Sequence, residues 1–231
     1  MTEKIFWSEP YRSELSTVIS GVEGQVITLE KTIFFAFSGG QESDEGSIGG
    51  IEVISAEAVG KDIFYTLSEG HGLEVGQPVV VAIDWPRRYR LMRLHFAAEL
   101  VLELVMKHMQ PVEKIGAHIA ASKARIDVLR EQSITGELPR IQEMAQAVID
   151  ADHPIVSAFS RETEQLRYWE ISGFARVPCG GTHLRSTGEV GTLSLARKNP
   201  GRGKERINIF VSNMEPPYPV NNRQGDLVDS P

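Results

Sequence analysis

Four side chains that could bind a metal ion stand in two short stretches of the sequence. Cys179, the only cysteine, precedes His183 by four positions in the segment Cys-Gly-Gly-Thr-His. His95 and Glu99 are also four positions apart, in an apolar segment where one helical turn would place both on the same face. A thiolate, two imidazoles and a carboxylate are ligands that zinc takes in a tetrahedral site. We therefore predict a metal site that joins these two distant stretches.

Basic residues are clustered next to both stretches. A cluster of this kind is usually a solvated surface, but its position beside a metal site favours contacts with the phosphates of a nucleic acid. The first cluster lies just before the apolar segment and the second lies just after the Cys-Gly-Gly-Thr-His segment. The candidate phosphate contacts are Arg87 and Arg88 in the first cluster, and Arg197, Lys198, Arg202 and Lys204 in the second.

The composition is that of an ordinary globular protein with an acidic balance. The chain has 231 residues, of which 41% are hydrophobic and 24% charged, and its net charge is −7. This charge excludes a general nucleic-acid coat protein, so phosphate binding would have to be local. No apolar run reaches the roughly 18 residues of a membrane helix, and the start lacks the apolar core of a signal peptide. With one cysteine and hence no internal disulfide, we expect a cytoplasmic protein that contacts no membrane.

Residues 1–86 are predicted to form a small β-barrel. Between residues 25 and 83, short stretches rich in β-branched and aromatic residues alternate with glycine-rich turns. About five or six strands in so short a length are typical of a small barrel. The segment Asp84-Trp85-Pro86 ends this part of the chain.

Residues 87–213 are predicted to form an antiparallel sheet packed with helices, which makes the fold class α+β. Apolar residues spaced three and four apart predict one helix from Tyr89 to His108 and another from Leu138 to Ile149. Strands are expected at 118–119, 124–129, 155–156, 189–195 and 207–211. The proline-rich residues 214–231 show no periodicity and are predicted to be a loose tail.

The chain resembles the AlaX-type alanyl-tRNA editing proteins, which are freestanding relatives of the editing domain of alanyl-tRNA synthetase. The most specific part of this resemblance is the Cys179–His183 segment. The resemblance covers nearly the whole chain, in the longer form that keeps an N-terminal barrel. It implies a fold like the second additional domain of threonyl- and alanyl-tRNA synthetases. Further matching residues are Ser38–Gln41, Asp44, Asp84, Trp85, Arg88, residues 115–119 and 123–127, Thr187, Glu189 and Gly191.

The resemblance implies ATP-independent hydrolysis of a wrong amino acid, chiefly serine but also glycine, from the 3′ end of mischarged alanine tRNA. A synthetase pocket shaped for alanine excludes glycine poorly, because one methyl group is worth only about 1–3 kcal/mol. Zinc held by His95, Glu99, Cys179 and His183 could polarise the ester carbonyl, generate hydroxide or anchor the substrate. The expected substrate-binding residues are Gly39, Gly40, Gln41, His118, Gly180, Gly181 and Thr182.

The apolar helix departs from the family pattern at two positions. Members of the family carry two histidines four positions apart with a threonine after the first, whereas this chain has Phe96 after His95 and Glu99 as the second. Glu99 could be a fourth metal ligand, a general base acting on metal-bound water, or an idle surface residue. Its spacing from His95 favours the ligand role.

Three functions are therefore considered. The first is a trans-editing hydrolase acting on aminoacyl-tRNA, favoured by the three retained ligands. The second is a non-catalytic RNA-binding relative whose metal site changed when Glu99 arose, and a closed structural zinc site would fit this reading. The third is a metallohydrolase that acts on another small ester or amide without any dependence on tRNA. No oligomeric state is predicted.

Overall fold

The computed structural model describes residues 1–221, so residues 222–231 of the predicted tail lie outside the described part. The chain divides into two compact units. The first unit contains Met1–Ser38, Ser43–Tyr89 and the segment from Pro216 onward, and the second contains Gly39–Glu42 and Arg90–Glu215. The domain limits at residues 86 and 213 stay predictions.

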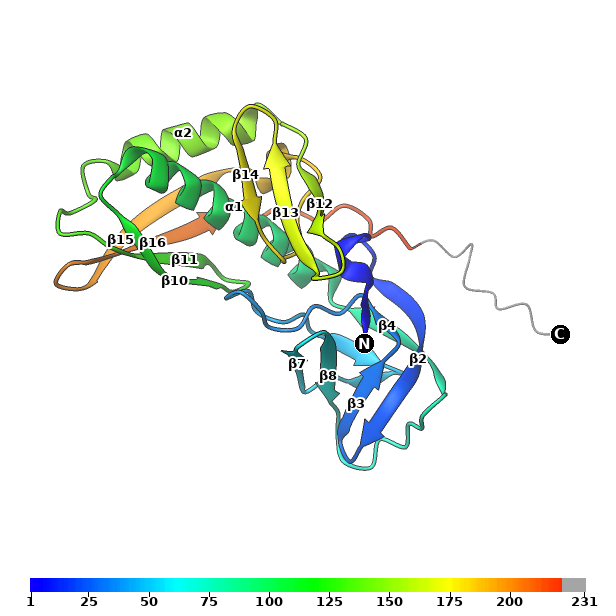
Figure 1. Cartoon of the computed structure of the whole chain (residues 1–231). Coiled ribbons are helices and arrows are strands. Elements are labelled where there is room, and N and C mark those ends of the chain that lie inside the picture. The colour runs from blue at the N-terminus through cyan, green and yellow to red at the C-terminus, as the bar shows by residue number, and fades with distance from the viewer. Residues whose placement is uncertain (222–231) are drawn as a thin grey trace. The chain divides into compact units, whose positions relative to one another are not determined.

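The first unit is built on a curled antiparallel sheet of seven strands in the order β6-β5-β9-β2-β3-β8-β7 (Figure 1). The longest strand, β2 (Glu14–Glu23), pairs with both β3 (Val26–Leu29) and β9 (Pro78–Ile83). Because the described strand order ends at β6 and β7 without pairing them, the closed barrel stays a prediction. The other strands of this sheet are β5 (Gly46–Ile48), β6 (Ile51–Glu52), β7 (Ser55–Val59) and β8 (Asp62–Thr66). A separate pair is formed by β1 (Glu3–Lys4) and β4 (Lys31–Thr32), and a short 3₁₀ helix, η1 (Ile5–Trp7), follows β1.

The core of this unit follows from the alternation of side chains along its strands. In β2, Leu15 and Ile19 face inward and are almost completely buried, as are Ile27 and Leu29 of β3. Pro217 also packs in this unit, since its carbonyl oxygen accepts a hydrogen bond from the Trp85 indole N–H.

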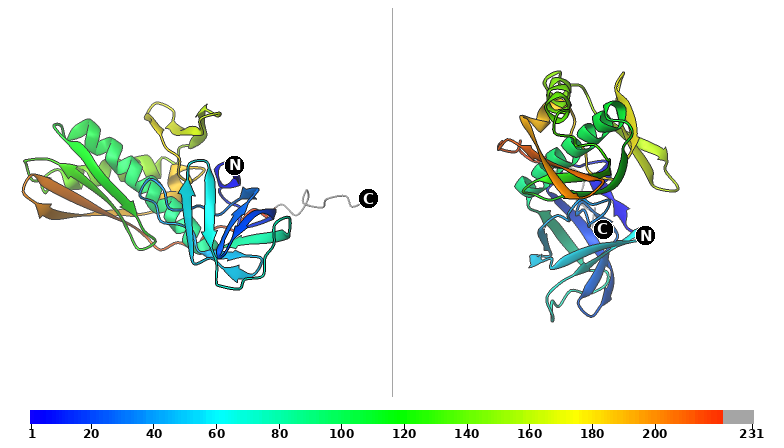
Figure 2. Two further views of the ribbon diagram at one scale, coloured as in Figure 1. Left: turned by 60° about the horizontal axis from the view of Figure 1, so that its bottom comes forward. Right: turned by 90° about the vertical axis from the view of Figure 1, so that its left-hand side faces the viewer.

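The second unit contains α1 from Arg90 onward, α2 and two antiparallel sheets. The helix α1 (Trp85–His108) begins in the first unit, and α2 (Leu138–Asp150) packs on β15. Both helices lie on one face of a four-stranded sheet of order β10-β11-β16-β15 (Figures 1 and 2). None of the described helices combines the length and apolar character needed to cross a membrane. The strands of this sheet are β10 (Glu113–Ile119), β11 (Ala124–Leu129), β15 (Leu193–Gly201) and β16 (Lys204–Val211).

A second sheet in this unit corrects the expected architecture. Strands β12 (Val156–Arg161), β13 (Leu166–Ile171) and β14 (Ala175–Pro178) pair in that order, separately from the four-stranded sheet. The prediction of a single antiparallel sheet that included residues 155–156 is therefore wrong. The physical reason is the buried ring of Trp169 on β13, which packs edge-on against Phe96 of α1 at 5.2 Å between ring centres.

Two element boundaries also differ from those predicted. α1 begins at Trp85 rather than at Tyr89, because the Asp84 carboxylate accepts the Arg87 backbone N–H and Pro86 suits the first turn. Glu189 does not lie in a strand but in a short 3₁₀ helix, η2 (Thr187–Val190), which a reciprocal capping box with Ser186 closes. The predicted second helix and the predicted strand pair at 118–119 and 124–129 are confirmed.

Candidate metal centre

The second unit brings the four predicted metal ligands together. One nitrogen of each imidazole, the Cys179 sulfur and a Glu99 carboxylate oxygen all lie within 4.8 Å of one another. Cys179 Sγ is 3.2 Å from His95 Nε2 and 3.2 Å from His183 Nε2. The Glu99 oxygens lie 3.7 Å from His95 Nε2 and 3.9 Å from His183 Nε2. Two segments far apart in the sequence therefore present ligand atoms to one point.

These distances fit a tetrahedral metal ion. Ligand bonds of about 2.0–2.3 Å at tetrahedral angles place neighbouring ligand atoms about 3.3–3.6 Å apart. The four separations given above, 3.2 to 3.9 Å, bracket this range, and no pair among the four ligand atoms exceeds 4.8 Å, so an ion could be bound after modest side-chain movements. The donor set of one sulfur, two nitrogens and one oxygen is one that zinc accepts.

Helix geometry and one glycine bring the two ligand pairs into contact. His95 and Glu99 lie one turn apart on α1, which directs both side chains to the same side. Cys179 follows directly after β14, and its N–H donates to the Arg167 carbonyl oxygen and so extends the strand pairing. A Cβ at Gly181 would lie 2.5 Å from the His95 ring, so only glycine permits this approach of loop and helix.

One backbone hydrogen bond of the loop is directed at a predicted metal ligand. The Gly181 N–H points at the Cys179 sulfur at 3.4 Å. This donor supports negative charge on the sulfur, and a substrate role for Gly181 stays a prediction. Gly180 is exposed, and a substrate role for it stays a prediction.

Three residues beside the cluster were not found from the sequence. Ser157 Oγ on β12 lies 2.9 Å from His183 Nδ1, an outer contact that orients the ring of a metal-binding histidine. The Trp169 indole N–H donates a hydrogen bond to Glu99 Oε2. Arg167 Nη1 donates to the Gly181 carbonyl oxygen at 3.4 Å. The aromatic and β-branched residues of Leu166–Ile171, namely Tyr168, Trp169 and Ile171, are the sequence signal that could have revealed β13 and with it two of these contacts.

Burial controls protonation in the cluster. Burial lowers the pKa of His95. The pKa of His183 falls well below the ordinary value, because burial is reinforced there by the neighbouring His95 and Arg167. Burial, reinforced by the charge of Glu99, raises the pKa of the Cys179 thiol well above its ordinary value. Near neutral pH the imidazoles are thus neutral with free lone pairs, and the sulfur must lose a proton to bind a metal.

Gln41 and Thr182, two predicted substrate-binding residues, are buried next to each other. The Gln41 side-chain amide donates to Thr182 Oγ1 at 3.2 Å, and Gln41 Oε1 has no hydrogen-bond partner among the described residues. Gly40 has a positive φ of 87°, and a Cβ there would lie 2.6 Å from the Ala117 carbonyl oxygen. His118 Nε2 lies 3.3 Å from Glu42 Oε1, next to the buried Ile119 that ends β10.

The structure removes Arg88 from the predicted phosphate contacts. Its guanidinium is completely buried in the first unit, where it forms an ion pair with the equally buried Asp44. A phosphate could reach it only if this buried pair were broken, which would leave a carboxylate without its partner. Arg87 is half-buried and binds the Ser43 carbonyl oxygen and the Glu45 carboxylate.

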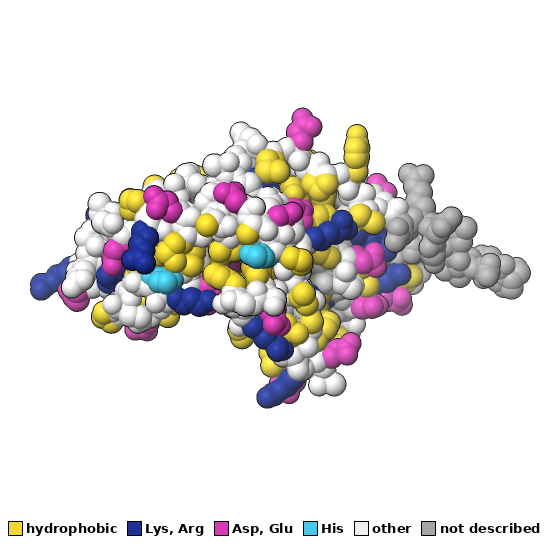
Figure 3. Space-filling view, turned by 90° about the horizontal axis from the view of Figure 1, so that it is seen from above, with side chains coloured by type: hydrophobic (Ala, Val, Ile, Leu, Met, Phe, Trp, Pro, Cys, Tyr) yellow, Lys and Arg dark blue, Asp and Glu magenta, His cyan; other side chains and the backbone are white. Residues whose placement is uncertain are grey.

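The second basic cluster lies on the β15–β16 hairpin. Lys198, Arg202 and Lys204 are exposed, whereas Arg197 forms two hydrogen bonds of 2.6 Å with the buried Glu205 carboxylate. This pairing neutralises Arg197 and weakens the case for it as a phosphate contact. On the face shown in Figure 3, basic side chains occur in small groups with acidic side chains between them.

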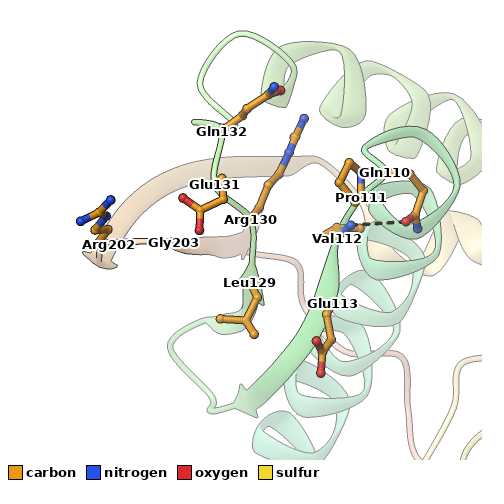
Figure 4. Close-up of a pocket in the computed structure, with 10 residues that line it drawn as sticks. All are labelled: Gln110, Pro111, Val112, Glu113, Leu129, Arg130, Glu131, Gln132, Arg202 and Gly203. Carbon is orange, nitrogen blue, oxygen red and sulfur yellow. Dashed lines mark hydrogen bonds between the residues drawn. The ribbon is translucent and has the colours of Figure 1, made fainter.

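A pocket in the second unit lies apart from the metal ligands. It forms where the end of α1, the start of β10, the end of β11 and the β15–β16 turn meet (Figure 4). Glu113 and Glu131 offset the charges of Arg130 and Arg202, and Arg130 is already bound to Glu137. The pocket is therefore not a basic site for a phosphate chain.

Comparison with known proteins identifies relatives of the whole chain, although no family model matches it. The AlaX-M alanyl-tRNA editing protein of Pyrococcus horikoshii is 29% identical over 219 residues, which are 91% of this chain and 98% of that protein. The AlaX-M protein of Methanosarcina acetivorans is 28% identical over 90% of this chain and 98% of its own length. The predicted resemblance is confirmed.

The chain is similar to AlaX-M proteins along nearly its full length, and to only a part of the larger synthetases. The alanine–tRNA ligase of Ignicoccus hospitalis is 34% identical over 219 residues, which are 84% of this chain but 24% of the ligase. The chain thus spans about a quarter of such a ligase. The full-length match makes the freestanding AlaX-M proteins the better guide to this chain.

Proposed function

We propose that this chain is a metal-dependent hydrolase that removes serine, and glycine as a second substrate, from mischarged alanine tRNA in the cytoplasm. The observation that carries the proposal is the convergence of His95, Glu99, Cys179 and His183 in a chain similar to AlaX-M proteins over 91% of its length. In this proposal residues 1–86 form the barrel of the longer family members, and residues 87–213 form the editing domain.

The proposed cofactor is zinc, held by those four side chains. When bound, zinc supplies a Lewis acid for the ester carbonyl and lowers the pKa of a bound water. The chain's own contribution is to hold the donors in place and to keep them neutral until metal binds. Glu99 acts either as the fourth ligand or as a base that takes a proton from the attacking water.

Gln41 and Thr182 are proposed to receive the aminoacyl group. The unsatisfied Gln41 Oε1 is a buried acceptor, which a substrate ammonium or hydroxyl group could satisfy. Thr182 immediately precedes the ligand His183, and its hydroxyl is held by the Gln41 amide. Burial of this polar pair beside the ligands supports a role in substrate recognition rather than in packing alone.

Hydrolysis of seryl-tRNA is the direct test. The purified, zinc-loaded protein is expected to release serine from seryl-alanine tRNA, and a chelator is expected to abolish this activity, with restoration by added zinc. Release that does not require tRNA, measured on a small seryl ester, would favour the general metallohydrolase. Tight tRNA binding without any release would favour the non-catalytic relative and would contradict the proposal.

Binding of the tRNA is expected to depend on salt through the β15–β16 hairpin. Lys198→Gln, Arg202→Gln and Lys204→Gln should each lower the slope of log affinity against log salt by about one, because each removes one phosphate contact. The matched control is Arg140→Gln, which removes an exposed charge from α2 and should leave the slope unchanged. If all three hairpin variants kept the slope of the unmutated protein, these three side chains would not contact phosphates of the tRNA.

A further inference from the structure

The two positions at which this chain departs from the family pattern meet at one side chain. Trp169 is completely buried on β13, where its ring packs against Phe96 at an interplanar angle of 71°. Its indole N–H donates to Glu99 Oε2. Phe96 and Glu99 lie on α1, so Trp169 contacts both unusual residues from the neighbouring sheet.

This contact restricts how Glu99 can present its carboxylate. Glu99 is half-buried, with its side chain 20% exposed, and Oε2 carries the indole hydrogen bond. Both oxygens lie near a nitrogen proposed to bind metal, Oε1 at 3.7 Å from His95 Nε2 and Oε2 at 3.9 Å from His183 Nε2, and Oε2 is the one that already carries the indole hydrogen bond. A histidine in the place of Glu99 would offer one fixed ligand nitrogen, whereas a glutamate has an additional torsion and two equivalent oxygens to control. The indole N–H removes that freedom.

We infer that Trp169 is a positioning residue for Glu99, which holds Oε2 with its N–H and thereby presents Oε1 to the metal. Phe96 in turn holds the indole ring at the required angle. This inference rests on the proposed metal site. Indole is a suitable donor for this task because it never ionises and has no acceptor that could compete for the metal. Partners that orient a ligand from outside the first coordination shell typically change metal affinity by about 10–100-fold when removed.

Zinc affinity, measured by competition with a chelator, gives the first test. Trp169→Phe removes the N–H and keeps an aromatic ring beside Phe96, and it is expected to weaken zinc binding at least about tenfold. The matched control is Trp85→Phe, which removes another buried indole whose N–H donates to a carbonyl oxygen, here that of Pro217. We expect this control to bind zinc as tightly as the unmutated protein.

Cobalt substitution gives a second readout, which loss of packing alone would not change. Cobalt bound by a sulfur, two nitrogens and one carboxylate oxygen should show strong visible absorption bands typical of tetrahedral coordination. In Trp169→Phe these bands should shift or weaken, because the carboxylate is no longer held in one orientation. In Trp85→Phe they should match those of the unmutated protein.

An isosteric replacement separates the hydrogen bond from the ring. In a Trp7→Phe/Trp85→Phe background, Trp169 is the only tryptophan, and it can be replaced biosynthetically by benzothienylalanine, which keeps the two-ring shape but lacks the N–H. We expect this protein to lose zinc affinity as Trp169→Phe does. In a Glu99→Ala background, the effect of Trp169→Phe should disappear, because no carboxylate remains to be oriented.

The outcomes distinguish this inference from the proposed function. An unmutated protein that binds no zinc would overturn both. Normal zinc affinity and a normal cobalt spectrum in the benzothienylalanine protein would overturn only the positioning role of Trp169. Equal losses from Trp169→Phe with and without Glu99 would overturn it as well, since they would show that the ring acts on the fold and not on Glu99.

Discussion

Cys179→Ala is expected to deprive the protein of its metal and of part of its thermal stability. The cysteine supplies the sole thiolate of the cluster. Removing a residue that only orients a ligand weakens metal affinity by up to roughly 100-fold, so removing this ligand itself should weaken zinc affinity by more than that. At saturating zinc, a 100-fold loss of affinity lowers the free energy of unfolding by about 2.7 kcal/mol. For a protein of this size, this corresponds to a fall in Tm of roughly 5–10 °C, measurable by calorimetry.

The pH dependence of zinc binding shows whether the thiol is a ligand. Because burial raises the pKa of Cys179 well above its ordinary value, the metal-free protein carries a proton on sulfur, and that proton must leave when metal binds. The imidazoles, whose pKa values are lowered, are already neutral above pH 7. Zinc affinity of the unmutated protein should therefore rise about tenfold per pH unit between pH 7 and 9.

The same titration provides the controls for Cys179. In Cys179→Ala the rise of affinity with pH should vanish, since no ligand proton remains to be released. His153→Ala removes an exposed histidine outside the cluster and should keep the metal, the Tm and the pH slope of the unmutated protein. Normal metal content in Cys179→Ala would show that the ligand assignment is wrong.

Substitutions of Glu99 are expected to have the largest effect on turnover. If Glu99 is the fourth ligand, it and Cys179 together carry a charge of −2, which cancels that of Zn²⁺ and makes a weak Lewis acid. Glu99→His restores a neutral ligand and should keep the metal while keeping or raising the rate of serine release. Glu99→Gln should weaken zinc binding, because an amide oxygen is a poorer ligand than a carboxylate.

The alternative role of Glu99 predicts a different pair of results. If Glu99 is the base that takes a proton from water, both variants should bind zinc normally but lose about 10²–10⁴-fold in rate. Glu103→Gln makes the same change of charge one turn further along α1 and serves as the matched control, with full activity expected. Full metal content and full activity in both Glu99 variants would exclude both roles.

The helical half of the site could be predicted from the sequence because its geometry is local. The i, i+4 spacing of His95 and Glu99 and the apolar periodicity around them suffice to place two ligands on one side of a helix. The Cys179–His183 segment likewise places its two ligands close together along the chain. Local spacing cannot show that these two pairs face each other, and the expectation that they do came from the chemistry of the four side chains.

Residues whose roles depend on distant partners were misjudged or missed. Arg88 looks like a surface cation in the sequence, but a buried partner, Asp44, forty-four positions earlier makes it an internal ion pair. Trp169 has no unusual sequence context, because its importance comes from the packing of β13 against α1. Local patterns do not encode a partner that lies in a distant segment of the chain.

The sequence by itself determined the donor atoms and the helix that carries two of them. Tertiary structure decided which atoms meet: it separated β12, β13 and β14 into a sheet beside α1, buried Arg88, and directed the Trp169 N–H to Glu99. The physical reason is that periodicity and ligand chemistry act over a few residues, whereas the burial of polar groups is settled by contacts between segments that only the folded chain brings together.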